Sequence, residues 1–262
     1  MRLIEGKVAL VTGGASGNGR AIAVALARQG ASAVVIADVR KDPREGGAPT
    51  HELIARETEA STEFVQGDLS SDEGIAAAVA AAERFGGAEI LVNNAGLYWA
   101  EDFLEVTREQ YRRMMDVNVL APFFLSQAVA QGMIARGGGS VVNVTSGAAV
   151  VGSAGRSTYC TSKGALQTMT YALAAELGPR GVRVNAVMPG MIRTAMTTVD
   201  VPSATPEALA ATLKFIPMRR VGEPEDVADA VVYLCSALAG YVNGAGIEVD
   251  GGALHCINLN AD

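Results

Sequence analysis

Short apolar runs that alternate with longer helical patterns constrain the fold of this chain most strongly. Seven runs are short and mostly apolar: Val8–Thr12, Ala33–Ala37, Phe64–Gln66, Ile90–Asn93, Ser140–Thr145, Arg183–Val187 and Gly246–Val249. Continuously apolar strands that alternate with helices are typical of a parallel sheet buried on both faces. We therefore expect an α/β fold, a doubly wound parallel sheet of about seven strands flanked by helices, in which the ligand binds at the carboxyl ends of the strands.

Helical periodicity fills most of the intervals between these runs. Helices are predicted over Arg20–Gln29, from Ser71 or Asp72 to about Phe85, over Glu109–Arg136 with an irregular turn near Pro122, over Thr158–Leu177 and over Glu225–Ser236. Two segments lack a clear period. Residues 41–50 are charged and rich in glycine and proline, and a segment near 191–216 follows Pro189-Gly190. We expect the second segment to be a substrate lid on a single domain over residues 1–262.

The composition excludes several classes of partner. Hydrophobic residues make up 49% of the 262 residues and charged residues 19%, which suits a large buried core. The formal net charge of −7 repels phosphate backbones and anionic lipids, so we expect neither a nucleic acid nor a membrane partner. No apolar run approaches the length of about 18 residues that a membrane span needs.

Cysteine and histidine usage limits the chemistry further. The three cysteines are far apart and odd in number, so we expect no disulfide framework and a reducing, cytoplasmic location. The two histidines, His51 and His255, have no other metal ligand beside them in the sequence. We therefore expect no metal site and no histidine-based hydrolase. The first residues lack the apolar core of a signal peptide.

A glycine-rich turn lies between the first predicted strand and the first helix. Its sequence runs Thr12-Gly-Gly-Ala-Ser-Gly-Asn-Gly19. Glycines permit a tight turn and let backbone N–H groups approach a pyrophosphate, and the helix N-terminus adds a favourable dipole. A plain strand–helix turn would also account for such a stretch on its own. The position between strand and helix favours a dinucleotide site.

An acidic residue follows this turn at the distance that a dinucleotide site requires. Asp38 ends the second strand, 19 residues after Gly19. An acid at this place accepts hydrogen bonds from a ribose 2′-hydroxyl and repels a 2′-phosphate, so the cofactor predicted is NAD. Asp38 would also serve as a strand-end turn residue, and the nearby Arg40 weakens the preference for NAD over NADP.

Tyr159 and Lys163 are spaced four residues apart in a predicted helix, so their side chains share one face. A nearby ammonium stabilises a phenolate and lowers the pKa of the tyrosine, which then becomes a usable acid or base. Taken alone, such a pair is usually just a helix face. Its meaning depends on what else the chain carries.

Several motifs occur together in one order along the chain. They are Thr12-Gly-x-x-x-Gly17-x-Gly19, Asn93-Asn94-Ala95-Gly96, Asn118, Ser146, Tyr159-Cys160-Thr161-Ser162-Lys163 and Pro189-Gly190. This ordered set resembles the short-chain dehydrogenase/reductase family from Gly6 to Gly252. Each motif is moderately specific, whereas the ordered set is highly specific. The resemblance implies a Rossmann-like fold and an NAD-dependent alcohol dehydrogenase or ketone reductase.

The resemblance implies a catalytic set of Ser146, Tyr159, Lys163 and Asn118. Tyr159 would be the general acid in reduction and the base in oxidation. Lys163 would lower the pKa of Tyr159 and hold the nicotinamide ribose, and Ser146 would bond the substrate oxygen. Asn118 would hold a water that links Lys163 to solvent. As residues alone, Ser146 would equally cap a turn and Asn118 would bond a neighbouring strand.

The resemblance also implies a set of cofactor-binding residues. These are Gly13, Ser16, Gly17, Asn18, Gly19, Asp38, Asp68, Leu69, Asn94, Ala95, Gly96, Tyr159, Lys163, Pro189, Gly190, Ile192 and Thr194. Asp68 matches the position that contacts the adenine amino group, although a helix-entry turn would also use it. Asn93 matches a position that stabilises the sheet. Asn18 departs from the family, which usually has an aliphatic residue there, and puts a polar group near the phosphates.

Three stretches are expected to line the substrate pocket: Leu97–Trp99, Gly147–Val151 and Met191–Met196. Because most of these side chains are apolar, the substrate expected is a neutral, small-molecule secondary alcohol or ketone. Tyr98 and Trp99 fit either the pocket or a surface or subunit contact. Arg193 is the one candidate anion clamp in these stretches, and a lid position would let it point to solvent.

Two rival functions and an oligomeric state complete the expectations. One rival is an NADPH-dependent 3-oxoacyl thioester reductase, against which Asp38 argues. The other is a non-catalytic dinucleotide-binding protein, which would not need the complete proton-transfer set. The resemblance implies a homotetramer that pairs the helices predicted over Glu109–Arg136 and Thr158–Leu177.

Overall fold

A computed structural model describes residues 2–198 and 205–256 of the chain. Its centre is a sheet of seven parallel strands in the order β3-β2-β1-β4-β5-β6-β7. The strands are β1 Val8–Thr12, β2 Ala33–Asp38, β3 Ser61–Gln66, β4 Ile90–Asn93, β5 Gly139–Val144, β6 Val182–Pro189 and β7 Gly246–Val249. The prediction of a seven-stranded doubly wound sheet is confirmed.

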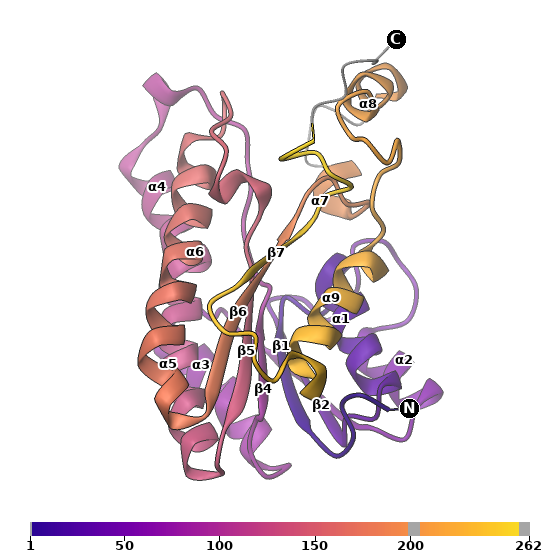
Figure 1. The fold of residues 1–262 in the computed structure, drawn as a ribbon, viewed down its shortest axis with the longest axis vertical. Coiled ribbons are helices and arrows are strands. Elements are labelled where there is room, and N and C mark those ends of the chain that lie inside the picture. Colours follow the sequence, from indigo (N-terminus) through magenta and orange to yellow (C-terminus); the bar gives the residue numbers. More distant parts are fainter. Residues whose placement is uncertain (1, 199–204, 257–262) are drawn as a thin grey trace.

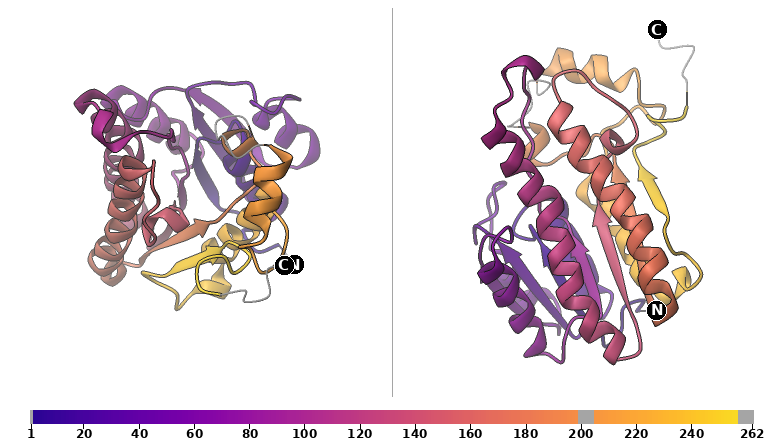
Figure 2. Two further views of the ribbon diagram at one scale, coloured as in Figure 1. Left: turned by 90° about the horizontal axis from the view of Figure 1, so that it is seen from above. Right: turned by 90° about the vertical axis from the view of Figure 1, so that its left-hand side faces the viewer.

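Helices cover the sheet on both faces (Figures 1 and 2). One layer holds α1 Gly17–Arg28, α2 Thr50–Glu57 and α9 Pro224–Cys235. The other holds α3 Asp72–Glu83, α5 Ala121–Ala135 and α6 Ser157–Leu177, with α4 Arg108–Met115 leading into α5. The short helices α7 Ala195–Thr198 and α8 Pro206–Leu213 lie at the carboxyl end of the sheet (Figure 1).

The strand residues alternate between two cores. Ala9 and Val11 of β1 pack with Ile22 of α1 and Val231 of α9. Leu10, between them, packs with Leu91 of β4 and with the α3, α5 and α6 layer. Because neighbouring residues of a strand point to opposite faces, a strand covered on both sides must be apolar at every position. This requirement is why the sequence signal for β1 is so clear.

The helix of the second layer has a π-helical turn at its centre. Residues 108–135 run as α4, the turn Asp116–Leu120 and α5 without a break. The predicted irregularity is therefore present, just before Pro122, and it contains Asn118. Within the described part of the chain, this run alone has the length and composition of a membrane span. Leu125, Val129 and Met133 are buried in the core beside the sheet, as in a core helix.

Several elements differ from the sequence expectations, and three of them show why. Helix α2 was not predicted, because only Thr50 and Ile54 of it are buried and a stretch rich in glycine and proline precedes it. Strand β3 begins at Ser61 rather than Phe64, since an edge strand with partly exposed residues tolerates polar side chains. Helix α1 begins at Gly17, three residues earlier than Arg20.

Candidate active site

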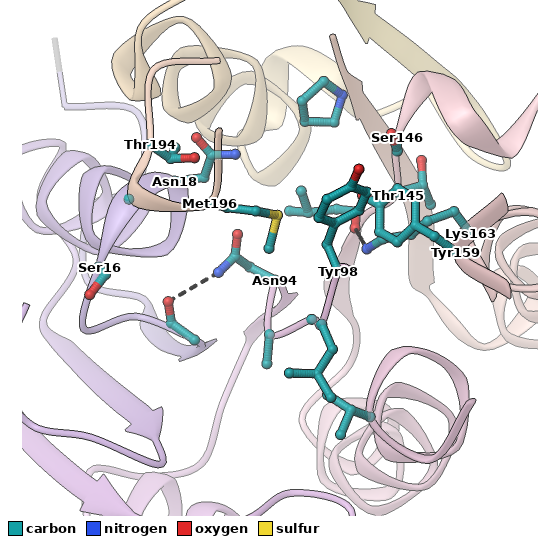
Figure 3. Close-up of a pocket in the computed structure, with 18 of the residues that line it drawn as sticks. Ser16, Asn18, Asn94, Tyr98, Thr145, Ser146, Tyr159, Lys163, Thr194 and Met196 are labelled. Atoms are coloured by element: carbon teal, nitrogen blue, oxygen red, sulfur yellow. Dashed lines mark hydrogen bonds between the residues drawn. The ribbon is translucent and has the colours of Figure 1, made fainter. Parts of the chain in front are cut away.

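A cavity of about 670 Å³ opens at the carboxyl ends of the strands. It lies where the chain leaves β1 for β2 on one side and β4 leads to β5 on the other, which is the switch point of a doubly wound sheet. Figure 3 shows Ser16, Asn18 and Thr194 on one side of this cavity and Ser146, Tyr159 and Lys163 on the other. The two halves of the predicted site therefore face one space.

Gly13 shows why the turn after β1 needs glycine. Its φ is +61°, and a Cβ there would lie 2.8 Å from the Cα of Ala95. The side chain of Asn94 donates hydrogen bonds to the carbonyls of Thr12 and Gly13, at 3.0 and 3.1 Å. The hydroxyl of Thr12 in turn accepts from the backbone N–H groups of Asn94 and Ala95. The two loops at the switch point are thus fastened to each other (Figure 3).

Most of the predicted cofactor-binding residues line the cavity. They are Gly13, Ser16, Gly17, Asn18, Asp38, Asp68, Leu69, Asn94, Ala95, Gly96, Tyr159, Lys163, Pro189, Gly190, Ile192 and Thr194. Gly19 is not among the lining residues. It lies behind the turn, where a Cβ would overlap the carbonyl oxygen of Gly13. Gly19 therefore lets the helix approach the turn closely.

The carboxylate of Asp38 is held at the end of β2. Its two oxygens accept hydrogen bonds from the backbone N–H groups of Ala15 and Arg40, at 3.1 and 3.2 Å. Arg40 and Arg44 line the same part of the cavity. This part of the cavity therefore combines one fixed carboxylate with two arginines, of which Arg44 was not predicted.

The segment after β2 folds over the glycine-rich turn. The carboxylate of Glu45 accepts a hydrogen bond from the backbone N–H of Gly17 at 2.9 Å. The backbone N–H of Arg44 donates to the hydroxyl of Ser16 at 2.8 Å. An anionic side chain thus lies on a helix N-terminal N–H of the kind that binds phosphate groups. The sequence indicated only that this segment is polar.

Asp68 is engaged by its neighbours. One carboxylate oxygen accepts from the backbone N–H and the hydroxyl of Ser70, and the other accepts from Arg113 at 2.9 Å. Burial opposes the charged carboxylate, but these hydrogen bonds outweigh it and lower the pKa of Asp68. Asp68 lies in a helix-entry turn, as one reading from the sequence held, and it also lines the cavity; its contact with adenine stays a prediction. Arg113 was not predicted.

Asn18 is the polar residue that distinguishes the glycine-rich turn after β1. It lines the cavity, and its side-chain oxygen is buried without a hydrogen-bond partner among the described residues. Thr194 lies close to the same turn, since a Cβ on Gly17 would be 3.2 Å from its methyl group. Figure 3 shows Asn18 beside Thr194. A buried carbonyl without a donor is costly unless a ligand or water supplies one.

Ser146 and Tyr159 meet across the cavity from the glycine-rich turn. Ser146 lies two residues after β5 in an extended conformation, and its hydroxyl accepts from the backbone N–H of Ala148. Burial raises the pKa of Tyr159, while a hydrogen bond from Ser146 and the positive charge of Arg156 oppose the rise. The net shift is upward. The lowered pKa expected for Tyr159 is therefore not found in the protein alone, because desolvation outweighs the groups that favour the phenolate.

Lys163 is buried beneath this pair, with an exposed fraction of 5%. Its ammonium donates to the carbonyl of Val144 at 2.9 Å and lies 5.8 Å from the centre of the Tyr159 ring. Burial lowers the pKa of Lys163 to about 8. The helical spacing of four residues therefore does bring the two side chains to the same place, as predicted.

Asn118 supports the floor of the site from the π-helical turn. It is fully buried, and its oxygen accepts from the backbone N–H of Leu97 at 2.7 Å. Its amide nitrogen donates to the carbonyl of Leu97 and to the hydroxyl of Ser162. Asn118 is absent from the cavity lining among the described residues. These contacts match the second reading of Asn118, a polar residue that binds neighbouring backbone.

Residues of all three predicted stretches line the cavity, together with others that were missed, of which Arg156 is the charged one beside Tyr98. Tyr98 stands edge-on to Tyr159, with ring centres 5.1 Å apart and planes at 88°. The guanidinium of Arg156 lies 5.6 Å from the centre of the Tyr98 ring. Tyr98 and Arg156 both line the cavity, whereas the indole of Trp99 donates to Glu101. Arg156 lies only three residues before Tyr159, and that proximity was the available signal.

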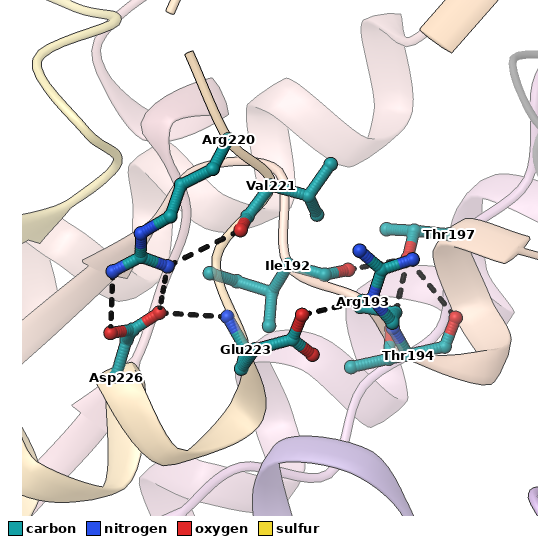
Figure 4. Close-up of polar contacts among 8 residues, drawn as sticks. All are labelled: Ile192, Arg193, Thr194, Thr197, Arg220, Val221, Glu223 and Asp226. Carbon is teal, nitrogen blue, oxygen red and sulfur yellow. Dashed lines mark hydrogen bonds and ion pairs between the residues drawn. The ribbon is translucent and has the colours of Figure 1, made fainter. Parts of the chain in front are cut away.

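The start of the lid segment is anchored outside the cavity (Figure 4). Arg193 pairs with Glu223 at 2.9 Å, and Arg220 makes a bidentate pair with Asp226 at the N-terminus of α9. Arg193 is thus directed away from the cavity, as the alternative reading held. The part of the predicted lid at 199–204 lies outside the described residues. In the described part, no cluster of residues suited to a metal ion occurs.

Comparisons with known proteins agree with this geometry. The profile of the family described as enoyl-(acyl carrier protein) reductase matches residues 13–254. The L-rhamnose-1-dehydrogenase of Scheffersomyces stipitis is 37% identical over 95% of this chain and 96% of its own.

Two solved structures share the fold. A protein described as a 2-deoxy-D-gluconate 3-dehydrogenase from Agrobacterium tumefaciens, with bound NADP, is 38% identical, with a TM-score of 0.85 over 96% of this chain and 98% of its own. A 7α-hydroxysteroid dehydrogenase in complex with NADH and 7-oxo glycochenodeoxycholic acid is 32% identical, with a TM-score of 0.88 over 98% and 97%. The relatives thus bind nicotinamide dinucleotides of both kinds.

Proposed function

The chain belongs to the short-chain dehydrogenase/reductase family, and from this premise we propose that it interconverts a secondary alcohol and a ketone with NAD(H), using Tyr159 as the general acid and base. The observation that carries the proposal is the convergence of two groups of residues on one cavity. Ser146, Tyr159 and Lys163 lie on one side of it, and the turn at Gly13–Gly17 lies on the other.

The residues of the turn fit a dinucleotide. Gly13 lets the turn lie close against Ala95, since a Cβ would be 2.8 Å from the Ala95 Cα, and Asn18 presents a buried carbonyl that has no donor among the described residues. Ser16 and Gly17 would face the diphosphate, and Asp38 would accept from the adenosine ribose. Lys163 would hold the nicotinamide ribose. The cofactor supplies or accepts the hydride when bound.

The protein's own residues handle the proton. Because the pKa of Tyr159 is raised, its hydroxyl is protonated near neutral pH and suits donation to a carbonyl oxygen during reduction. Ser146 hydrogen-bonds the same oxygen and fixes its position. In oxidation Tyr159 must first lose its proton, and the charges of Arg156 and Lys163 favour the phenolate that forms.

NAD is proposed over NADP on account of Asp38. A carboxylate fixed by two backbone N–H groups repels a 2′-phosphate and accepts from a ribose hydroxyl. Arg40 and Arg44 act in the opposite sense, since arginine binds phosphate well. We expect NAD to be preferred but not exclusive.

The rival thioester reductase shares this fold and draws support from a 3-oxoacyl-[acyl-carrier-protein] reductase of Vibrio cholerae that is 36% identical over 95% of this chain. It differs in its cofactor, NADPH, and in its substrate, a 3-oxoacyl thioester. A large preference for NADPH together with turnover of such thioesters would favour it. The non-catalytic alternative is disfavoured, because a binding protein would not need the proton-transfer residues.

A lid over residues 191–216 and a single domain over residues 1–262 belong to the same proposal. Met191, Ile192, Met196 and Thr212 line the cavity from this segment. Its closure would exclude water from the reacting atoms. Arg193 and its partner Glu223 would anchor the near end of the lid.

A homotetramer in the cytoplasm is the proposed state of the protein. Phe123 and Phe124 of α5 and Tyr171 of α6 are 41%, 44% and 49% exposed. Helices α5 and α6 lie side by side on one face (Figure 2, right). Exposed aromatic side chains on such a face support burial against a second copy. Sedimentation analysis tests this, with a monomer as the contradicting result.

The direct test is a panel of secondary alcohols with NAD or NADP, followed by absorbance of the reduced cofactor. Turnover with a preference for NAD supports the proposal. Binding of NADH without turnover of any alcohol or ketone would favour the non-catalytic alternative instead.

A further inference from the structure

A positive charge occupies the substrate side of the cavity. Arg156 lies at the N-cap position of α6 and lines the cavity. It is half-buried, and its guanidinium faces the ring of Tyr98 at 5.6 Å. Tyr98 in turn stands against Tyr159. The cation, the intervening ring and the general acid therefore follow one another along the cavity wall.

No carboxylate neutralises this cation among the described residues. Arg156 has no ion pair and no side-chain hydrogen bond there, although Arg113 pairs with Asp68 and Arg193 with Glu223. Glu101 contacts the two residues that follow Arg156 in the chain, and its carboxylate accepts hydrogen bonds from other groups.

Three hydrogen-bond donors occupy the carboxylate of Glu101. It accepts from the hydroxyl of Ser157, from the backbone N–H of Thr158 and from the indole of Trp99. These bonds lower the pKa of Glu101 against the opposing effect of burial. Glu101 therefore serves the N-terminus of α6. A guanidinium left without an acid in a partly apolar cavity is a binding element for an anion.

The charge of Arg156 also reaches the reacting group. It opposes the rise of the Tyr159 pKa, so its field extends to the hydroxyl that donates the proton. Ala148, Val151 and Met196 line the same side and lower the local dielectric, which strengthens an ion pair. The guanidinium of Arg156 is 5.6 Å from the ring centre of Tyr98, which is 5.1 Å from that of Tyr159, so one small molecule can span from Arg156 to Tyr159.

We propose that Arg156 binds the carboxylate of the substrate, so that this enzyme interconverts oxo acids and hydroxy acids. This inference rests on the proposed function and replaces the uncharged substrate expected from the sequence. In reduction, hydride passes from NADH to the carbonyl carbon and the proton passes from Tyr159 to the oxygen. Oxo acid, NADH and one proton thus give hydroxy acid and NAD.

The test compares oxo acids with their methyl esters. Acetoacetate, levulinate and 5-oxohexanoate place the carboxylate at increasing distances from the ketone, and each ester removes only the charge. In the wild type, one acid is expected to exceed its ester in kcat/KM by about 30-fold or more. Arg156→Gln should reduce this ratio to near one, and Arg156→Lys should retain part of it.

Arg193→Gln is the matched control, since it removes an arginine of the lid segment that is paired outside the cavity. It should keep the wild-type ratio of acid to ester. An ester preferred by the wild type, or an equal loss of both substrates in Arg156→Gln, would overturn the proposal.

Binding provides a readout that does not need turnover. Calorimetric titration of the NADH complex with the corresponding hydroxy acid, a pair that cannot react, should show that Arg156→Gln weakens acid binding at least 10-fold. If no ketone reacts but Arg156→Gln binds the acid more weakly, the anion site is supported and the proposed reaction is refuted. If neutral ketones react and acids bind equally well to the wild type and to Arg156→Gln, the anion site is refuted and the proposed reaction is not.

Discussion

The ammonium of Lys163 donates a hydrogen bond to the carbonyl of Val144 at 2.9 Å, and Lys163 is only 5% exposed to solvent. Val144 ends β5, two residues before Ser146. The bond ties α6 to the strand that leads to Ser146. Burial without a carboxylate partner lowers the pKa of Lys163 to about 8. The buried ammonium therefore lowers the stability of the folded protein.

Lys163→Met should stabilise the fold at pH 7 while removing activity. A lysine whose pKa falls from 10.5 to about 8 on folding costs about 3 kcal/mol below pH 8, and the cost fades as pH rises from 8 to 10.5. Loss of the bond to Val144 offsets about 1 kcal/mol. We expect a net gain of about 2 kcal/mol in the free energy of unfolding by urea at pH 7.

The control for this prediction is the same measurement at pH 10. There the gain should shrink, because the wild-type lysine is then neutral in the folded state. A variant less stable than the wild type at pH 7 would contradict the assignment of a strained, buried ammonium.

The rate of alcohol oxidation should rise with pH. Oxidation needs Tyr159 deprotonated, and burial raises its pKa, so the reactive fraction grows through the alkaline range. Reduction needs the protonated form and should fall at high pH. Profiles of kcat/KM in both directions test this. Tyr111→Phe, on the exposed face of α4, should leave both profiles unchanged; a flat oxidation profile would disagree.

Asp38→Asn should shift the cofactor preference toward NADP. The change removes the charge that repels a 2′-phosphate, while Arg40 and Arg44 remain. The ratio of kcat/KM for NAD to that for NADP should fall about 10-fold or more. Asp42→Asn removes an exposed acid from the same segment and should not change the ratio. An unaltered ratio in Asp38→Asn would remove the basis for proposing NAD.

Glu45→Gln should tighten cofactor binding. The carboxylate of Glu45 lies on the backbone N–H of Gly17, where a diphosphate would be attracted, so the two anions compete. We expect the Kd for NADH to fall about threefold to tenfold, measured by fluorescence titration. Glu52→Gln removes one charge nearby, paired with Lys41 at the surface, and serves as the control. Weaker binding in Glu45→Gln would show instead that Glu45 supports the turn.

The sheet could be predicted because its strands are apolar on both faces. β1 and β4 carry no polar interruption before their ends, so their limits were correct. The edge strand β3 was cut short, since Ser61–Glu63 are polar and half-exposed. Helix α2 buries only Thr50 and Ile54, so its pattern was too weak to detect.

Some residues of the candidate site could be predicted from the sequence, and others could not. Motif order identified the residues around the turn and at Tyr159, because those residues are adjacent in the sequence. Arg156 and Glu45 were missed, since their roles arise from what lies beside them in space. The sign of the Tyr159 pKa shift was also missed, because desolvation depends on packing that no spacing rule reveals.

Tyr159→Phe, assayed at saturating cofactor, tests the central claim most directly. The variant keeps the ring that packs against Tyr98 and loses only the hydroxyl. We predict that kcat falls by about 10³-fold while the Kd for NADH changes less than about threefold. Turnover within tenfold of the wild type would contradict Tyr159 as the general acid and base.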